Sequence, residues 1–243
     1  MGLPGKLLEA VKLIYSRPAC RLNDFSYDKY WLDKRPDTLG KITPFQLARL
    51  KLILPRIEAH SCIADIGCGD GGVLFQLREA VPSSSFIAID NSAVALDCIS
   101  ARGVSTLVLD LSSADSATQV PAVDYALLFE ILEHMSDPER FLLGLMKRVS
   151  RRIFISVPNT GYFAHRLRLL FGRFPLQWRL HPGEHLRFWT SSDMAWWLSE
   201  LGLQECCSIR HYEGIPLLNR LWPSMFAMGM LIEIDCSRYS PSK

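Results

Sequence analysis

Strand-like and helix-like patterns alternate along the central part of the chain. Short runs rich in apolar and β-branched residues occupy 62–66, 85–90, 104–109, 123–129 and 152–157. Between them, apolar residues with helical spacing occupy 71–80, 92–101 and 137–149. Strands that alternate with helices are typical of a parallel sheet with helices on both faces. The pattern therefore predicts an α/β fold with a mostly parallel sheet.

The segments around this core complete the expected sheet. Thr43 followed by Pro44 is a helix-start signal and predicts a helix over 43–58. Residues 161–190 interrupt the alternation, and we expect them to form a lid insertion. After the lid, the pattern predicts a helix over 191–201 and β-rich runs at 204–212 and 226–235. These last runs are expected to form an antiparallel edge.

The chain is expected to form one large domain with short additions at both ends. We expect an N-terminal helical cap over 1–42, a domain over 43–236 that includes the lid, and a tail over 237–243. Helix 3–16 carries an apolar row flanked by Lys6, Lys12 and Arg17. Such a helix either lies on a membrane surface or packs on its own domain. No stretch is long and apolar enough to span a bilayer.

Composition narrows the class of protein. Hydrophobic residues make up 49% of the 243 residues and charged ones 21%, which is typical of a folded globular chain. The net charge of +2 is too small to mark the whole surface as a binder of nucleic acid or membrane. The seven cysteines include no CxxC pair, which argues against a zinc site and a disulfide framework. We therefore expect a cytoplasmic protein, with a peripheral position on the inner face of the membrane as the alternative.

A glycine loop follows the first strand of the core. In CIADIGCGDGG, Gly67, Gly69 and Gly72 have the GxGxxG spacing of dinucleotide-binding folds, and Asp90 ends the next strand. Asp90 is placed to accept hydrogen bonds from both hydroxyls of a ribose, because a carboxylate presents two acceptor oxygens. Asp110, which ends the third strand, is placed to accept from an adenine amino group. The loop alone therefore permits more than one adenine-containing cofactor.

Asp65 discriminates between these cofactors. It lies two positions before Gly67, at the end of the first strand. A dinucleotide would bring its pyrophosphate beside this carboxylate, at a cost of several kcal/mol in a partly desolvated site. S-adenosylmethionine (SAM) carries a sulfonium and an ammonium instead, and Asp65 attracts both. Charge therefore favours SAM over a nicotinamide cofactor.

A second motif lies just after the fourth strand. The run DYALLFEILEHMSDP places Glu130, Glu133 and His134 at i, i+3 and i+4, on one face if the segment is helical. With DIGCGDG, FIAID and EILEH together, the chain resembles the class I SAM-dependent methyltransferases. The segments SVPNTGYFAHRLRLLFGRFPLQ and EHLRFWT are most similar to the group that contains MetW and the ubiquinone-biosynthesis O-methyltransferases.

The resemblance implies a Rossmann-like class I methyltransferase fold: a seven-stranded, mostly parallel sheet with helices on both faces and SAM over the carboxyl ends of its first strands. The expected cofactor-binding residues are Asp65, Gly67, Cys68, Gly69, Asp90, Asn91, Asp110, Leu111 and Glu130. Glu130, Glu133 and His134 are the catalytic candidates, with His134 as the base that removes a hydroxyl proton.

A metal is the alternative to a simple base. Glu130, Glu133, His134 and His185 resemble the four ligands of magnesium-dependent small-RNA 2′-O-methyltransferases. Two histidines are unusual ligands for a hard cation, so we expect no metal and interpret His185 as a histidine of the lid.

The expected reaction is O-methylation of a small-molecule, glycan or lipid-linked acceptor. The lid is rich in arginines and aromatics, which either hold phosphates and rings or form a small core with solvated arginines. An RNA 2′-O-methyltransferase and a non-catalytic, cofactor-binding regulator of the MetW type are the alternatives. A nucleic-acid partner is not our expectation.

Overall fold

The computed structural model describes residues 2–17, 27–34, 40–177 and 185–239. Parts of the expected N-terminal cap, lid and tail therefore lie outside the described residues. The first part of the expected tail belongs to a 3₁₀ turn, Cys236–Arg238, in which Asp235 accepts a hydrogen bond from the Ser237 N–H at 3.1 Å.

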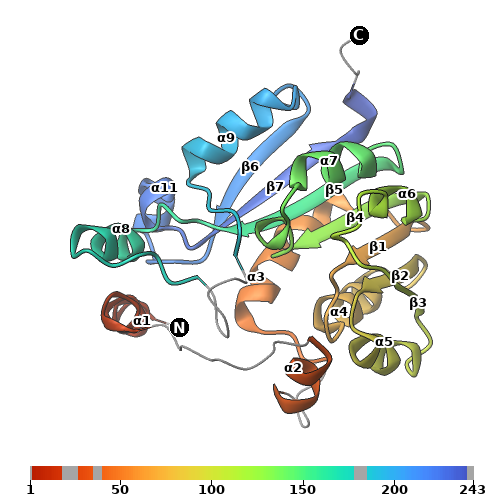
Figure 1. Ribbon diagram of the computed structural model, residues 1–243, viewed down its shortest axis with the longest axis horizontal. Helices are drawn as coiled ribbons and strands as arrows, with labels where there is room; N and C mark the ends of the chain where they lie inside the picture. Colours follow the sequence, from red (N-terminus) through yellow and green to blue (C-terminus); the bar gives the residue numbers. More distant parts are fainter. Residues whose placement is uncertain (1, 18–26, 35–39, 178–184, 240–243) are drawn as a thin grey trace.

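Seven strands form one sheet in the order β3-β2-β1-β4-β5-β7-β6 (Figure 1). They are β1 Cys62–Ile66, β2 Ser85–Asp90, β3 Ser105–Val108, β4 Val123–Phe129, β5 Val149–Pro158, β6 Cys207–Tyr212 and β7 Gly229–Asp235. The first five pair in parallel, and β7 pairs antiparallel with both β5 and β6. This confirms the predicted seven-stranded, mostly parallel α/β sheet. Its order differs from the 3-2-1-4-5-6 of dinucleotide-binding folds, because β7 lies between β5 and β6.

Helices cover both faces of the sheet. One face carries α3 Pro44–Ile53, α4 Gly72–Ala80 and α5 Ala93–Ser100, and the other carries α6 Ser116–Gln119, α7 Pro138–Leu145 and α9 Ser191–Glu200. Successive strand residues point to opposite faces, so Ile63 joins the core under α3 to α5, while Ala64 joins the core under α6, α7 and α9.

Local signals explain where two of the helices begin and end. Thr43 caps α3 as predicted: its backbone N–H donates to Gln46 Oε1 at 2.8 Å, and its Oγ1 accepts from the Gln46 N–H. The predicted helix 43–58 is too long. It becomes a 3₁₀ turn, Leu54–Arg56, because Pro55 has no N–H to donate and disrupts an α-helix. The helix predicted over 137–149 also ends early, at Leu145, because Val149 already pairs with Val123 in the sheet.

Further helices lie at the edge of the sheet where β1, β2, β4 and β5 end. They are α1 Leu3–Tyr15, α2 Tyr27–Lys34, α8 Phe163–Leu170, α10 Leu218–Leu221 and α11 Pro223–Phe226, with a 3₁₀ turn, Leu132–His134, after β4. Helix α2 packs against α5, and α1 packs against α8 (Figure 1). None of the helices in the described ranges has the length and apolar content needed to cross a membrane.

Candidate functional site

A pocket of about 740 Å³ opens at the carboxyl ends of β1, β2, β3 and β4. Parallel strands bring their carboxyl ends to one edge of a sheet, which is where open α/β folds bind ligands. The predicted residues that line this pocket are Asp65, Gly67, Cys68, Asp90, Asn91, Asp110, Leu111, Glu130 and His134. Gly69 lies beside the pocket under Trp31, and the buried Glu133 and His185 lie outside its lining.

Glycine is required at two positions of the loop after β1. Gly67 and Gly69 have positive φ angles of 69° and 54°, a conformation that costs other residues energy. A Cβ atom at Gly67 would collide with the side chain of Ile131, and one at Gly69 would lie 2.6 Å from the Trp31 ring. The loop therefore needs both the backbone freedom and the small size of glycine.

Asp90 holds the glycine loop in place. Its Oδ2 accepts a hydrogen bond from the Gly69 N–H at 2.8 Å, and its Oδ1 accepts from the Ser92 N–H at 2.9 Å. Burial raises the pKa of Asp90, although the N–H groups of Ser92 and Gly69 oppose the shift. Each carboxylate oxygen can accept a second hydrogen bond, so Asp90 can also meet a ligand.

Asp65 is a buried carboxyl group in the wall of the pocket. Only 3% of the residue is exposed. Burial raises its pKa to about 7; Arg49 opposes this shift and Asp90 adds to it. Near neutral pH the carboxyl is therefore poised between its two protonation states, and a cation in the pocket would favour the ionised one.

Asp110 lies at the exposed mouth of the pocket, and α2 forms a wall with Tyr30 and Trp31. The Ser112 N–H donates to Asp110 Oδ1 at 2.9 Å, which lowers the pKa of Asp110. Ser92 Oγ donates to Asp28 Oδ1 at 2.5 Å and thereby ties α2 to the start of α5. Asp28 was missed in the sequence, because no local pattern marks a contact between segments so far apart.

Glu130 leaves β4 in a left-handed conformation with φ of 59°. Its Oε1 accepts from Ser156 Oγ at 2.8 Å and from Arg49 Nη1 at 3.3 Å. Arg49 comes from α3, is 4% exposed and stacks on Phe129. In the sequence Arg49 is one of two basic residues in a mostly apolar helix, together with Lys51, and the local pattern does not show which of them is buried and needs a partner.

The proposed shared face of Glu130, Glu133 and His134 is therefore wrong. The segment is not an α-helix: Glu130 has positive φ, and only Leu132–His134 form a 3₁₀ turn. Glu130 pairs with Arg49 instead of joining the two residues that follow it.

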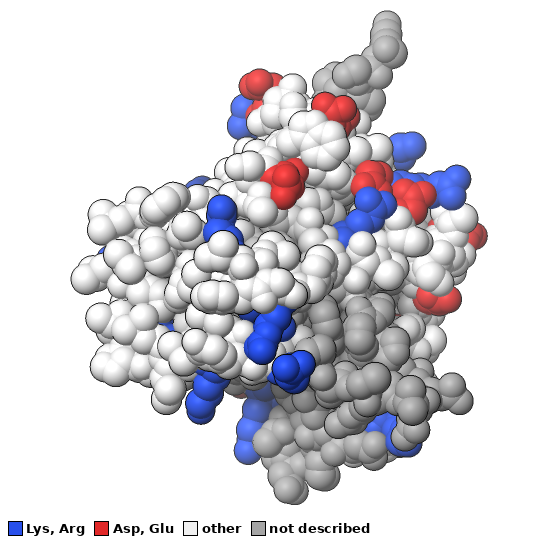
Figure 2. Space-filling view, turned by 60° about the vertical axis from the view of Figure 1, so that its left-hand side comes forward, with Lys and Arg blue, Asp and Glu red and all other residues white. Residues whose placement is uncertain are grey.

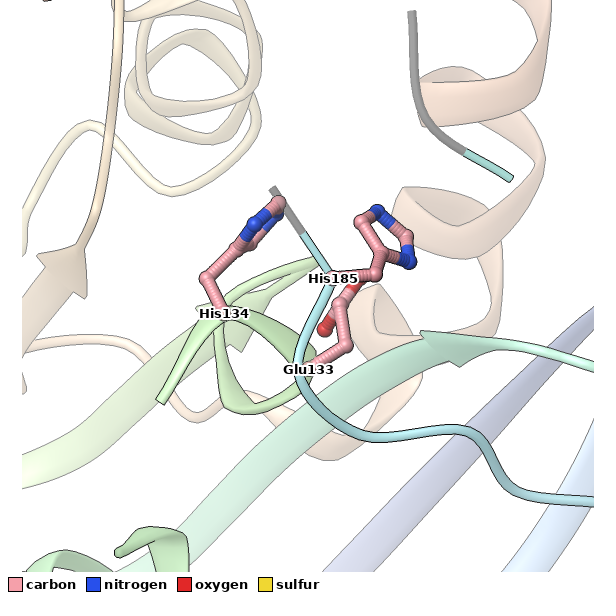
Figure 3. Close-up of side chains that lie close together, drawn as sticks. All are labelled: Glu133, His134 and His185. Carbon is pink, nitrogen blue, oxygen red and sulfur yellow. The ribbon is translucent and has the colours of Figure 1, made fainter. Parts of the chain in front are cut away.

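Glu133, His134 and His185 form a separate cluster (Figure 3). Each offers a ligand atom, and these atoms lie within 4.8 Å of one another. Glu133 and His134 come from the turn after β4, and His185 comes from the lid. The N–H groups of Leu186 and Arg187 donate to the Glu133 carbonyl at 2.8 and 3.1 Å and so hold the lid against this turn. Glu130 is not a member of this cluster.

Two of the three residues of this cluster are buried. Glu133 is 1% exposed, and neither of its carboxylate oxygens has a hydrogen-bond partner among the described residues. The same holds for Nδ1 of His185. Burial raises the pKa of Glu133 well above its ordinary value and lowers the pKa of His185 to about 4. Burial therefore disfavours the charged forms of Glu133 and His185.

Several lid arginines donate hydrogen bonds to carbonyl groups of the protein itself. Arg166 Nε donates to the Gly161 carbonyl at 2.6 Å, and Arg168 donates to carbonyls at the end of α1. Arg187 donates to the Ser136 carbonyl at 2.7 Å and pairs with Glu139. These contacts favour the interpretation of the segment as a packed lid over that of a phosphate-binding surface.

Comparison with known protein families identifies the family of the chain. Residues 48–213 match the family described as methionine biosynthesis protein MetW, and the match spans well over half of the chain. The chain belongs to the MetW family. None of the curated protein sequences compared matches this MetW-family chain.

Solved structures similar to this MetW-family chain are methyltransferases. A SAM-dependent methyltransferase from Thermotoga maritima has a TM-score of 0.56 and 14% identity, with 86% of this chain and 97% of that one covered. The methyltransferase domain of bacterial CtHen1 has a TM-score of 0.54 and 18% identity, with 78% and 98% covered. A chain from the Haloferax volcanii complex of the methyltransferase activator Trm112 and its candidate methyltransferase has a TM-score of 0.59 and 15% identity, with 87% and 98% covered. Identities this low establish the methyltransferase fold alone.

Proposed function

We propose that the chain binds SAM and transfers its methyl group to a hydroxyl group of a small-molecule, glycan or lipid-linked acceptor. One observation carries the proposal: Asp65, Asp90 and Glu130 line a single pocket at the glycine loop. Arg49 offsets the charge of Glu130, but Asp65 and Asp90 have no cation paired with them among the described residues. The carboxyl groups therefore disfavour a pyrophosphate and favour a ligand with a sulfonium and an ammonium. The SAM-dependent methyltransferase fold supports the same choice.

The cofactor would lie along the loop that ends β1. Gly67, Cys68 and Gly69 allow the backbone to approach it, and Asp90 with Asn91 would meet the ribose. Asp110 and Leu111 line the pocket where the adenine would lie. Asp65 and Glu130 would face the cationic end.

Methyl transfer requires alignment and, for a hydroxyl acceptor, the loss of a proton. The bond from the methyl carbon to the acceptor oxygen forms as the bond from that carbon to sulfur breaks, and the sulfonium becomes a neutral thioether. His134 lines the pocket and would take the hydroxyl proton. Arg49 and Ser156 hold Glu130 in place for this step.

A divalent metal is a second candidate, and the buried Glu133 favours it. Two carboxylate oxygens without hydrogen bonds at 1% exposure are unusual unless a proton or a cation occupies the site. Glu133, His134 and His185 would be the ligands, and two imidazoles with one carboxylate suit manganese, iron or zinc better than magnesium. A metal there would lower the pKa of the acceptor hydroxyl. His134 would then be a ligand and not the base.

The test is transfer of labelled methyl from SAM into a fractionated cell extract. Label in a small molecule, glycan or lipid that appears only with the protein supports the proposal, and label in RNA supports the RNA alternative. SAM binding without transfer to any fraction supports a regulator.

Variants separate the base from the metal. The base hypothesis predicts that His134→Ala binds SAM normally but loses turnover. It also predicts that a chelator leaves the turnover of the wild type unchanged. The metal hypothesis predicts that chelation abolishes turnover, that Mn²⁺ restores it, and that Glu133→Gln loses Mn²⁺ binding in calorimetry. His60→Asn, at an exposed histidine outside the pocket, is the control.

A further inference from the structure

Helix α1 presents one wide apolar face that the domain covers only in part. Ala10 and Ile14 are buried against α8 and its neighbours. Leu3, Leu7, Val11 and Tyr15 recur every four residues along and beside this face and are 45–68% exposed. A helix that only packs on its own domain buries its apolar face, so these exposed side chains require an explanation.

Contacts at both ends of α1 hold the exposed row outward. At the C-terminal end, the buried Arg168 Nη1 donates to the carbonyls of Leu13 at 2.7 Å and Ser16 at 2.8 Å. Near the N-terminal end, Lys6 Nζ lies 2.8 Å from Glu213 Oε2. These contacts stabilise the orientation in which the row lies on the surface.

Two other segments extend this surface. The residues at the end of α8 and after it expose Leu170 at 75% and Phe171 at 65%, and α10 exposes Leu221 at 81%. Arg173 Nη1 donates to the Tyr15 carbonyl at 3.1 Å, and the rings of Phe163 and Phe226 lie 5.5 Å apart, so both segments adjoin α1 or α8. We call the exposed apolar side chains of α1, of 169–174 and of 217–222 the apolar face.

The charge around the apolar face is positive. Lys12, Arg17, Arg166 and Arg220 are exposed on these segments or next to them. Within the three segments Glu9 is the one acidic residue, and both Glu9 and the nearby Glu213 have a carboxylate oxygen within 3.6 Å of Lys6 Nζ. Figure 2 turns this side forward: Lys and Arg project from an otherwise uncharged surface, and the visible Asp and Glu side chains lie toward the top and right.

We infer that the apolar face docks onto a membrane surface that contains anionic lipids. Exposed leucines and aromatics beside lysines and arginines match the acyl and headgroup layers of such a surface. A second copy of the chain would instead oppose positive charge with positive charge. Helix α8 begins shortly after β5 ends, at the sheet edge where the pocket opens, so docking places the pocket beside the bilayer.

Flotation of the full chain with vesicles tests the inference. Vesicles of phosphatidylglycerol and phosphatidylcholine should bind the protein, vesicles of phosphatidylcholine alone should bind it much less, and salt should weaken binding. The double variant Leu170→Ser/Leu221→Ser should bind the anionic vesicles about tenfold or more weakly, because two exposed apolar anchors are lost. Arg17→Glu/Arg220→Glu should lose the preference for anionic lipid.

Controls keep the outcome decisive. Trp196→Ser removes a side chain that is 63% exposed on α9, outside the apolar face, and should bind vesicles like the wild type. Unchanged circular dichroism shows that the variants fold. Absence of vesicle binding by the wild type would overturn the inference. A second result would also overturn it: the wild type forms a concentration-dependent dimer, and the leucine variant loses this dimer but binds vesicles like the wild type. The apolar face would then join two copies of the chain.

Discussion

The protonation state of Asp65 gives the sharpest prediction, because burial favours its neutral form whereas binding of a cationic cofactor favours its ionised form. In the free protein its pKa is raised from 3.8 to about 7, mainly by burial. The folded state therefore holds a proton more tightly than the unfolded chain. The resulting stability is fully present below pH 3.8 and is lost as the pH rises through about 7. Asp65→Asn, which cannot ionise, should be more stable than the wild type at pH 8.

The size of both effects follows from the shift. A difference of about three pH units corresponds to at most about 4 kcal/mol in the free energy of unfolding at pH 8. Binding of a cationic cofactor needs the ionised carboxylate. As the pH increases towards 7, the affinity for SAM should therefore rise by up to about tenfold per pH unit. Above pH 7 the affinity should level off. The α-ammonium of the cofactor stays protonated over this range.

Two assays measure the two effects on the same protein. Urea denaturation of wild type and Asp65→Asn at pH 5 and pH 8 gives the stability, and calorimetric titration with SAM between pH 5 and pH 7 gives the affinity. The variant should be more stable at pH 8, bind SAM weakly and lose most of the pH dependence. A wild-type affinity that is flat across this range, together with tight binding by Asp65→Asn, would refute the electrostatic role of Asp65.

Three further changes test other parts of the site. Gly67→Ala and Gly103→Ala both place alanine at a positive φ, of 69° and 76°. Gly103→Ala should cost about 1 kcal/mol of stability in urea denaturation, and Gly67→Ala should cost more, because its Cβ would also collide with the side chain of Ile131. Only Gly67→Ala should lose SAM binding in calorimetry, because Gly103 has open space around it and does not line the pocket. Equal losses of binding in the two variants would show that the loop is not part of the site. Arg49→Met should lower the free energy of unfolding by about 3 kcal/mol, since it leaves Glu130 without its cation; a change near zero would show that this ion pair contributes little. Trp31→Ala should weaken SAM binding and leave the urea midpoint nearly unchanged, whereas unchanged affinity would exclude α2 from the cofactor pocket.

The strands could be predicted closely because buried parallel strands appear as continuous apolar runs. The ranges predicted for β1, β2 and β4 agree with the structure at both ends. Helix ends were less accurate where a single residue decides them, as Pro55 does after α3. The loop residues of the pocket were also predictable, because each directly follows a strand whose end defines the site.

Contacts between distant segments could not be predicted from local patterns. The side chain of Arg49 reaches Glu130 from a helix more than eighty positions earlier. The resemblance to a metal-ligand set did group His185 with Glu133 and His134, and the structure brings these three together, with the lid bonded to the Glu133 carbonyl. No local pattern encodes either contact. The positive φ of Glu130 was equally hidden, because glutamate rarely adopts that conformation and spacing alone favours a helix.

A crystal structure of the chain with S-adenosylhomocysteine tests the central claim most directly. The proposed function predicts the product in the pocket of β1 to β4, with its ribose hydroxyls within hydrogen-bond distance of Asp90 and its sulfur toward Glu130 and His134. A well-ordered pocket without ligand at saturating concentration, or a ligand bound elsewhere, would contradict the account.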